Sequence, residues 1–321
     1  MRPAYALAVL LTLVGGAAIA QNADEQNETP ALVCGCPSGM KRGDMSLTTS
    51  YQHVTTTKHL FSRGEAIDRG HIRSNIVLLS LDYALTDRLA LSAGLPYVFS
   101  KYKGDFPHPT AIDDGTTHGT TQDYRVDLRY SVTAGQFIVT PAAGFVAPSR
   151  SYTYFAHAAA GRQLHEQFAA VNVERHLNEL LPGLFAQARY GFTFSEKMLG
   201  ISHNRSNVDL SVGYFVTPVL SVRALGSLQK THGGIDLLAA RRQTGELYIH
   251  HDQIARANHL DVAVGATYAY SDSLDIFFSA LRTLQGRNSH KVDFAPSIGL
   301  TWTIPAARWR SHRSCDVGSG S

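Results

Sequence analysis

Polar and apolar side chains alternate along most of the chain beyond residue 44. Residues 122–130 show this most clearly, because charged Asp123, Arg125, Asp127 and Arg129 alternate with apolar Tyr124, Val126, Leu128 and Tyr130. Successive side chains of a β-strand point to opposite faces, so this segment predicts a strand with one charged and one apolar face. Repetition of the pattern along the chain predicts an all-β protein.

Twelve segments follow this pattern, with ends placed to within a few residues. The predicted strands cover residues 45–57, 72–84, 88–101, 120–132, 136–147, 164–176, 183–195, 205–216, 219–230, 257–270, 274–284 and 290–304.

The joints between these strands are alternately tight and long. The tight ones are Thr86-Asp87, Thr133-Ala134-Gly135, Leu177 to Pro182, Thr217-Pro218 and Ser271-Asp272-Ser273. Longer polar joints are expected at residues 58–71, 102–119, 148–163, 196–204 and 231–256, with a short sixth joint at 285–289. Short periplasmic turns and long external loops are typical of bacterial outer-membrane barrels. The sequence therefore predicts a single antiparallel transmembrane β-barrel of about 12 strands, with both ends on the periplasmic side.

In such a barrel the apolar face of each strand would contact lipid. Examples are Ala186, Ala188, Tyr190, Phe192 and Phe194; Val208, Leu210, Val212 and Tyr214; and Leu260, Val262, Val264, Ala266 and Tyr268. Aromatic residues recur near segment ends, where they would meet the headgroups: Tyr83, Tyr97, Phe99, Tyr130, Tyr214, Phe215, Tyr268, Tyr270 and Trp302. A secreted β-sandwich that acts as a binding module, with these faces turned inward, is an alternative.

The chain ends differ in composition from the strand region. Residues 1–20 combine Arg2, an apolar stretch and Ala18-Ile19-Ala20, a pattern typical of a cleaved signal peptide. Residues 21–44 are expected to form a flexible periplasmic leader, 45–304 the barrel and 305–321 a periplasmic tail. Export to the outer membrane of a Gram-negative bacterium follows from this division.

Bulk composition excludes some function classes. The net charge of +3 is small and dispersed, so we expect no nucleic acid partner. The composition, with 44% hydrophobic and 17% charged residues, resembles that of a soluble protein, as expected for a barrel because half of each strand is polar.

The three cysteines lie outside the strand region: Cys34 and Cys36 precede the strands and Cys315 follows them. In an oxidising compartment a disulfide from Cys315 to Cys36, or to Cys34, is expected, and free thiols are the alternative.

The last strand, Ser297 to Ile304, resembles the signal read by the machinery that inserts barrels into the outer membrane, although here a tail follows it.

Several short motifs between residues 75 and 304 resemble those of a known protein family. They are Asp127-Leu128-Arg129-Tyr130, the Pro148-Ser149-Arg150 to Gly161-Arg162 loop, Asn207 to Tyr214 with Thr217-Pro218, Leu274-Asp275-Ile276, and Arg282 to Asn288. In order and spacing they resemble the MetA-pathway of phenol degradation family of outer-membrane proteins. The resemblance implies passage of small, often aromatic or apolar, compounds and no catalytic residues.

The residues expected to line the barrel lumen are Asp123, Arg125, Asp127, Arg129, Arg189, Asp209, Arg223, Asp261 and Asp293. Charges of both signs could tune selectivity, or they could only fill and brace a narrow barrel.

Two chemical alternatives, an enzyme and a metal site, are also compatible with parts of the sequence. An outer-membrane phospholipase-like enzyme would need a serine, a histidine and an orienting residue together, and Ser202-His203-Asn204 and Asn288-Ser289-His290 are the nearest clusters. His250-His251-Asp252 in the longest loop, which also holds a segment from Ile235 to Arg242 that could be a short helix, could bind zinc or copper. Because the other histidines are scattered, neither pattern outweighs the barrel. We therefore expect no enzyme, no metal and no cofactor, but a passive channel whose partners are membrane lipid, the insertion machinery and a small-molecule solute.

Overall fold

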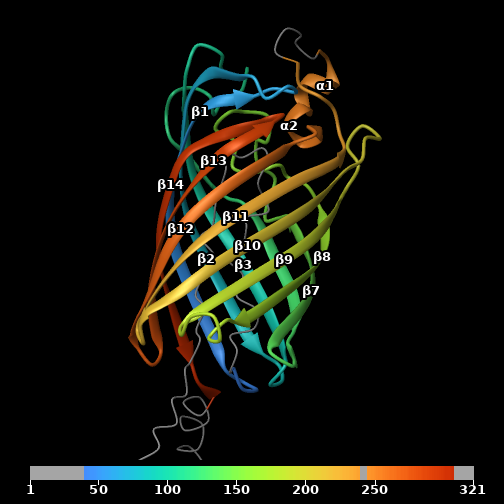
Figure 1. The fold of residues 1–321 in the computed structure, drawn as a ribbon. Helices are drawn as coiled ribbons and strands as arrows, with labels where there is room; N and C mark the ends of the chain where they lie inside the picture. Colours follow the sequence, from blue (N-terminus) through green and yellow to red (C-terminus); the bar gives the residue numbers. More distant parts are fainter. Residues whose placement is uncertain (1–39, 239–243, 307–321) are drawn as a thin grey trace, which may run out of the picture.

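The computed structural model describes residues 40–238 and 244–306. They form strands and two short helices (Figure 1). The strands are β1 (Met45–Leu60), β2 (Ala66–Ala84), β3 (Leu89–Lys103), β4 (His118–Thr121), β5 (Asp123–Tyr130), β6 (Val132–Ala134), β7 (Phe137–Pro148), β8 (Glu166–His176), β9 (Leu184–Ser195), β10 (His203–Thr217), β11 (Leu220–Gly233), β12 (Asn258–Ser271), β13 (Leu274–Arg287) and β14 (Ser289–Ile304). The helices are α1 (Glu246–Ile249) and α2 (His251–Ile254).

These strands close into a ring. Each strand pairs antiparallel with its sequence neighbours, and β1 pairs with both β2 and β14, which joins the two ends of the sheet. The segments β4, β5 and β6 together form one position in the ring, since β4 and β5 both pair with β3, and β5 and β6 both pair with β7. The predicted closed barrel of twelve antiparallel strands is confirmed, and the β-sandwich alternative is wrong.

Two of the joints are shorter than predicted. The ladder between β1 and β2 continues to Leu60 and Ala66, so residues 61–65 alone connect the strands instead of residues 58–71. A register shift between Thr56 and Lys58 breaks the alternation at this point, which hid the strand ends in the sequence. Between β13 and β14 the joint is Asn288 alone, instead of residues 285–289.

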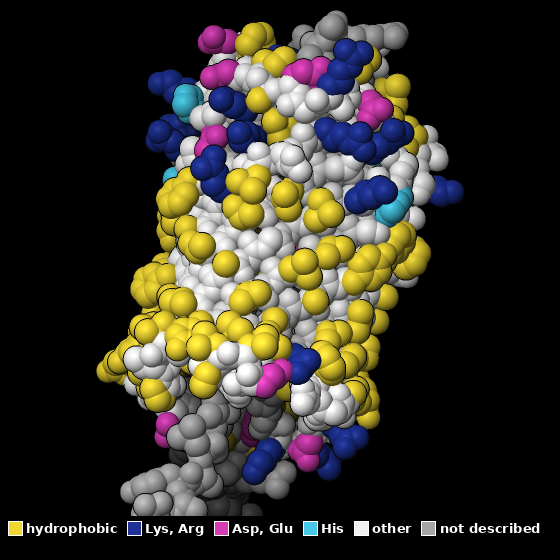
Figure 2. Space-filling model, viewed as in Figure 1, with side chains coloured by type: hydrophobic (Ala, Val, Ile, Leu, Met, Phe, Trp, Pro, Cys, Tyr) yellow, Lys and Arg dark blue, Asp and Glu magenta, His cyan; other side chains and the backbone are white. Residues whose placement is uncertain are grey.

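Large apolar side chains form a belt around the outside of the barrel (Figure 2). Leu210 is 58% exposed and Val264 is 62% exposed, although each lies at the middle of a regular strand. Their sequence neighbours Asp209 and Ala263 are buried, so exposure alternates as the pattern of the sequence predicts. Lys and Arg side chains gather beyond one edge of the belt, towards the long loops.

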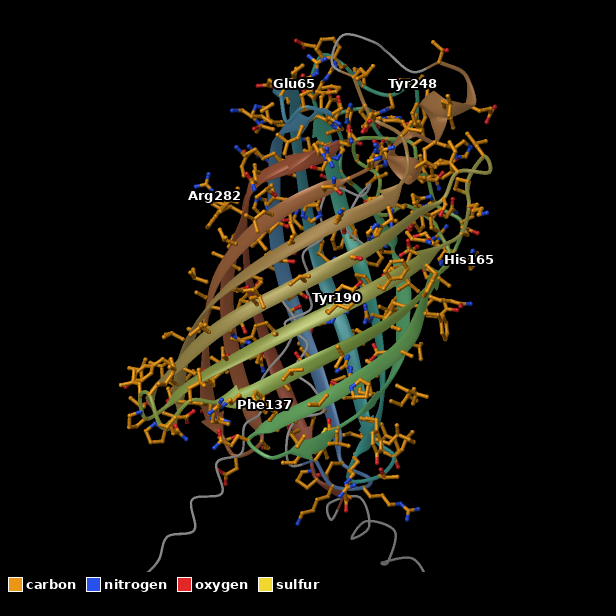
Figure 3. The ribbon with its side chains drawn as sticks, turned by 45° about the vertical axis from the view of Figure 1, so that its right-hand side comes forward. Glu65, Phe137, His165, Tyr190, Tyr248 and Arg282 are labelled. Carbon is orange, nitrogen blue, oxygen red and sulfur yellow. The ribbon has the colours of Figure 1, made fainter. Side chains whose placement is uncertain are left out.

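Aromatic side chains mark the turn end of this belt. Tyr83, Tyr130, Tyr268, Tyr270 and Trp302 are all exposed and lie close to the ends of strands at the short turns. Tyr190 lies midway along the wall, whereas Tyr248 belongs to the loops at the opposite end (Figure 3). An exposed aromatic row at one rim is the arrangement expected where a barrel meets an interface between water and lipid.

Inside the barrel, close approach of strands depends on glycine at two places. Gly213 lies directly opposite Phe185, and Gly299 directly opposite Phe277. A Cβ atom at either glycine would lie 2.1 Å from the ring of the facing phenylalanine. Both rings are buried, so each fills the space that the missing side chain leaves.

The helical content is confined to α1 and α2, four residues each, among the described residues. In the part of the chain that the structure describes, no helix has the length and apolar character needed to cross a bilayer.

A charge placed in the apolar belt should destabilise the folded barrel. We expect Leu210→Arg to lower the free energy of unfolding from lipid vesicles by about 2–4 kcal/mol, the cost of arginine near a bilayer midplane. Urea titration in vesicles measures this. The matched control is Leu180→Arg, because Leu180 is 73% exposed but lies in the turn after β8. Equal effects of the two substitutions would contradict lipid contact at Leu210.

Candidate functional site in the barrel interior and the loop cap

The first group of interior charges is a ladder on β5. The buried Asp127 carboxylate accepts hydrogen bonds from Arg125 Nε at 3.0 Å and from Arg129 Nε at 2.7 Å. Arg129 also reaches Asp82 on β2, with 3.3 Å between Nη1 and Oδ1. Arg125 lies over the Phe168 ring, 3.7 Å from its centroid. Each charge on this face therefore has a partner of opposite sign or an aromatic face.

The remaining residues expected in the lumen also have hydrogen-bond or ion-pair partners, and all except Asp293 are buried. Arg189 and Asp209 are buried and 3.2 Å apart, and Asp209 also accepts a hydrogen bond from Ser227. Arg223 donates to Thr267, and Asp261, fully buried, lies 3.0 Å from His259 Nδ1. Asp293 differs: it is only half-buried, lies between buried Val292 and Ala295 where the register shifts, and accepts a hydrogen bond from Thr57.

A stronger network was missed in the sequence. Glu166 accepts hydrogen bonds from Arg162 and Arg205, both at 2.7 Å, and from Ser195 at 2.8 Å. All four side chains are buried. Arg205 shares the strand parity of Asn207 and Asp209, so the alternation of β10 already indicated that it points inward. The link to Arg162 comes from a loop and had no signal in the sequence.

Apolar side chains cover another part of the interior. Val54, Ile76, Val98, Leu225, Ala263, Leu281, Val292 and Ala295 form one buried cluster with Ala160. They come from β1 to β3 and β11 to β14, whereas the charged ladders described above come mainly from β5, β8, β9 and β10. We call this cluster the apolar wall and the side with the ladders the charged wall, although buried polar residues such as Ser74, Ser100 and Ser227 also lie on the apolar side. Ala160 shows that a loop packs against the apolar wall.

Three loops cover the external end of the barrel, and we call them the loop cap: residues 104–117, 149–165 and 234–257, of which 239–243 lie outside the described part. The Tyr152 hydroxyl donates to Asp123 Oδ1 at 2.6 Å, which attaches the second loop to β5. Gln253 Nε2 donates to the Arg162 carbonyl at 2.6 Å, which joins the third loop to the second. Burial, and then Asp123, raises the pKa of Tyr152, so the phenol remains a hydrogen-bond donor.

Asp113 connects the first loop of the cap to the second. Its carboxylate accepts hydrogen bonds from the backbone N–H groups of His108, His157 and Ala158, and from His108 Nδ1 at 3.2 Å. Burial alone would raise the pKa of this carboxyl, but the bonds from the His108 side chain and from the three N–H groups outweigh it, and the pKa is lowered. Asp113 is therefore an ionised anchor between two loops.

Asn288 holds the third loop. Its side chain is fully buried, accepts a hydrogen bond from Leu237 N and donates to Asp236 and to the Arg256 carbonyl. The short helix considered from Ile235 to Arg242 is not helical where it is described: Ile235 forms a parallel bridge with Ala255, and the helices lie at 246–254. Asn288 therefore anchors this loop through the backbone of residues 237 and 256.

Neither serine–histidine cluster forms a catalytic arrangement. The buried Ser289 hydroxyl has no hydrogen-bond partner among the described residues, although a serine nucleophile requires contact with its base. His203 Nδ1 faces the Ile201 carbonyl at 3.4 Å, and Ser202 makes no side-chain hydrogen bond within the described part of the chain. Cys34, Cys36 and Cys315 lie outside the described residues.

Histidines from all three loops of the cap meet at its centre. His108 lies 4.3 Å from His157 and 5.7 Å from His251, measured between ring centroids. Phe155 and Tyr248 pack against the same rings. Burial, with added repulsion from His108 and His290, lowers the pKa of His157 to about 3, so this imidazole is neutral at physiological pH. The sequence could not show this meeting, because the loops are far apart in the chain.

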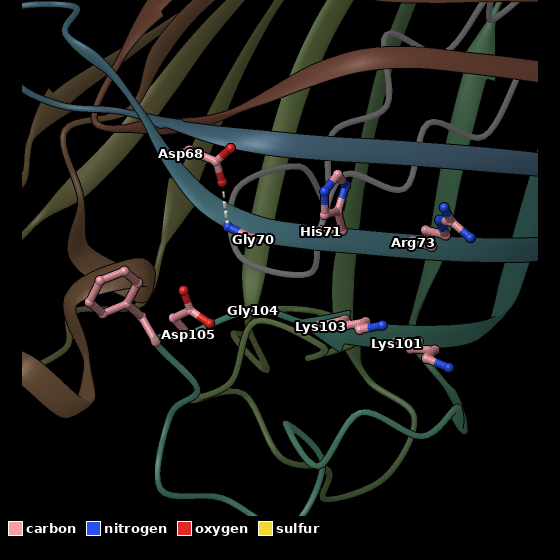
Figure 4. Close-up of a pocket in the computed structure, with 9 residues that line it drawn as sticks. Asp68, Gly70, His71, Arg73, Lys101, Lys103, Gly104 and Asp105 are labelled. Atoms are coloured by element: carbon pink, nitrogen blue, oxygen red, sulfur yellow. Dashed lines mark hydrogen bonds between the residues drawn. The ribbon is translucent and has the colours of Figure 1, made fainter.

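A separate groove of about 840 Å³ lies at the loop end of β2 and β3 (Figure 4). His71, Arg73, Lys101 and Lys103 line it, together with Asp68 and Asp105. His71 and Arg73 are exposed, whereas the alternate residues Ile72 and Ser74 are buried and point inward. This alternation places the groove on the outer wall of the barrel. It therefore does not belong to the barrel interior.

Comparison with a solved structure supports the fold. The chain is similar to the crystal structure of the COG4313 outer membrane channel from Pseudomonas putida F1, with 18% identity, a TM-score of 0.65, and coverage of 85% of this chain and 99% of that chain. The NanC porin structure is more distant, with 10% identity and a TM-score of 0.48, over 81% of this chain and 100% of that one. No protein-family model matches the chain, and no curated protein matches it. The family suggested by the sequence motifs therefore stays a prediction.

Removing the centre of the buried Glu166 network should destabilise the barrel. Glu166→Ala leaves two buried arginines without their anion, and we expect it to lower the free energy of unfolding by about 3–5 kcal/mol. The control is Glu179→Ala, which breaks the exposed pair with Arg175 and should cost at most about 1 kcal/mol. Urea unfolding in detergent compares them. A small loss for Glu166→Ala would show that the network does not brace the barrel.

Loss of the Asp113 anchor should release two loops without unfolding the barrel. We expect Asp113→Asn to raise hydrogen exchange at least about tenfold across residues 104–117 and 149–165, because charge-assisted hydrogen bonds contribute about 1.5–3 kcal/mol. Mass spectrometry of peptic peptides reads this out. Asp114→Asn is the matched control, since Asp114 bonds only to Thr116 and His118 in its own segment. Unchanged exchange in Asp113→Asn, or equal changes in both variants, would exclude the anchor.

Proposed function

We propose that this chain is an outer-membrane channel that lets small, aromatic or apolar compounds diffuse down their concentration gradient. The external apolar belt, the aromatic row near the turns and the basic region beyond the belt support insertion into a bilayer. The similar fold of a protein described as an outer membrane channel supports the same assignment. Exported location, a cleaved signal in residues 1–20 and insertion through the β14 motif are parts of this proposal.

The observation that carries the proposal is the two-walled interior. Val54, Ile76, Val98 and their neighbours form a buried apolar cluster on one side of the interior, which would favour contact with the hydrocarbon or aromatic ring of a solute that enters. Opposite them, the ladders on β5 and β10 hold fixed charges of both signs. Because those charges are paired, they do not create a strong field of one sign for ions.

A solute with an apolar body and one polar group fits such walls. Its ring can lie along the apolar wall, while its hydroxyl or carboxyl group forms hydrogen bonds with the charged wall. Small phenols and aromatic acids combine these features, and this choice agrees with the resemblance drawn from the sequence. Downhill passage requires only a path and a filter, so the proposal includes no cofactor and no catalytic residue.

The proposal predicts that the apolar wall determines which solutes pass. Purified protein in liposomes should admit a small phenol faster than a sugar of similar size. We expect Leu225→Asn to lower phenol entry several-fold and to leave sugar entry unchanged, because it puts an amide into the apolar wall. Stopped-flow uptake measurements with both solutes test this.

The matched control is Leu228→Asn on the same strand. Leu225 is 7% exposed and belongs to the interior cluster, whereas Leu228 is 47% exposed and lies on the outer wall. Leu228→Asn should therefore leave the ratio of phenol to sugar entry unaltered. No entry of any solute above protein-free liposomes would reject the channel, and equal effects of the two variants would reject the role of the apolar wall.

A further inference from the structure

Two histidines and a carboxylate converge inside the loop cap from two different loops. One nitrogen of His108, one nitrogen of His251 and one oxygen of Asp252 all lie within 4.8 Å of one another. His108 belongs to residues 104–117, and the other two residues begin α2. Their side chains are 6%, 13% and 6% exposed, so water has little access to them.

The orientation of His108 is fixed by its second nitrogen. Nδ1 faces Asp113 Oδ2 at 3.2 Å, and Asp113 is itself held by three backbone N–H groups. Because the carboxylate already accepts these bonds, Nδ1 carries the hydrogen and donates it. Nε2 of His108 then presents a lone pair, and it makes no hydrogen bond to any described residue.

His251 is held in the same manner. Its Nδ1 lies 2.5 Å from the carbonyl oxygen of Tyr248, which can only accept, so Nδ1 donates there as well. Nε2 faces Asp252 Oδ1 at 2.9 Å. The ring stacks on Tyr248 at an interplanar angle of 5° and lies nearly parallel to His108. A histidine that ligates a metal nearly always donates its other N–H to a carboxylate or a backbone carbonyl, and these two histidines show one case of each.

We propose that His108 Nε2, His251 Nε2 and Asp252 bind a divalent first-row transition metal ion such as Zn²⁺. Two imidazoles and one carboxylate form a donor set suited to zinc, copper or nickel, with further positions open to water. The neighbouring group of His108, Asp113 and His157 is less suitable, because the Asp113 oxygens already accept four N–H groups. This site does not depend on the passage of any solute.

Bound at this site, the ion would join the first and third loops of the cap. Asp113 already connects the first loop to the second, and Gln253 connects the third to the second. The ion would complete a closed set of links between the three loops over the end of the barrel. The adjacent pair His251-Asp252 alone supplies only two donor groups, so His108 is the residue that makes the site specific.

A protonated His251 provides the competing explanation for the short contact with Asp252. An imidazolium would donate to Tyr248 and Asp252 at once and would need neither an ion nor His108. The two explanations differ in whether His108 contributes to metal affinity and in whether the folded protein takes up one ion.

The test is calorimetric titration of the purified full chain with Zn²⁺, after chelator treatment and with its three cysteines alkylated so that no thiolate competes. We expect one Zn²⁺ per chain in the wild type, and at least about tenfold weaker binding in His108→Ala and in His251→Gln. Asp113→Asn, which weakens the acceptor of His108 Nδ1 and also loosens the first two loops of the cap, should weaken binding by about 10–100-fold. Co²⁺ absorption in the visible range gives an independent measure of ligation.

His165→Ala is the matched control, because it removes an exposed imidazole from the same loop cap and should leave Zn²⁺ binding unchanged. Circular dichroism and the altered gel mobility of folded barrels establish that each variant is folded, and His251→Gln decides the question if His108→Ala does not fold. The proposal is overturned if the wild type takes up no stoichiometric Zn²⁺. It is also overturned if affinity survives in folded His108→Ala or folded His251→Gln, or falls equally in His165→Ala.

Discussion

Closure of the hydrogen-bonded ring is the constraint on which the rest of the structure depends. A sheet in an apolar medium cannot leave backbone N–H and C=O groups unpaired at an edge, because no water is present to satisfy them. The pairing of β1 with β14 removes the last free edge. Once the ring is closed, every second residue must point inward and the others must point outward, and the exposed belt at Leu210 and Val264 follows from that parity.

The same parity explains the chemistry of the interior. Charged residues at alternate positions of β5 point into the interior, where they pair with one another and with Asp82 on β2, two strands away in the ring. Val54 on β1 and Val292 and Ala295 on β14 belong to the apolar wall, between inward serine, threonine and glutamine residues of the same strands. Loops are subject to a weaker constraint, and they cover the external end by hydrogen bonds centred on Asp113, Tyr152 and Asn288.

Much of the fold could be predicted because it depends on local alternation. Eleven of the twelve predicted strands begin within two residues of the observed ones, and the second begins six residues earlier, at Ala66, because the shift beside Thr56 disturbs the pattern. The Glu166 network was partly visible, since Arg205 shares the parity of Asp209. The meeting of His108, His157 and His251 had no signal, because 49 and 94 residues separate these histidines along the chain and only folded loops bring them together.

The most direct test of the account is a spin-label scan of residues 207–212 on β10, in vesicles and in a background with Cys34, Cys36 and Cys315 replaced by serine. Collision rates with oxygen, which concentrates in lipid, and with a water-soluble nickel chelate report the surroundings of each label. The account predicts high oxygen collision rates at 208, 210 and 212 and low ones at 207, 209 and 211. Collision rates without a period of two, or high rates of contact with the nickel chelate at Leu210, would contradict a closed barrel with lipid on its outer face.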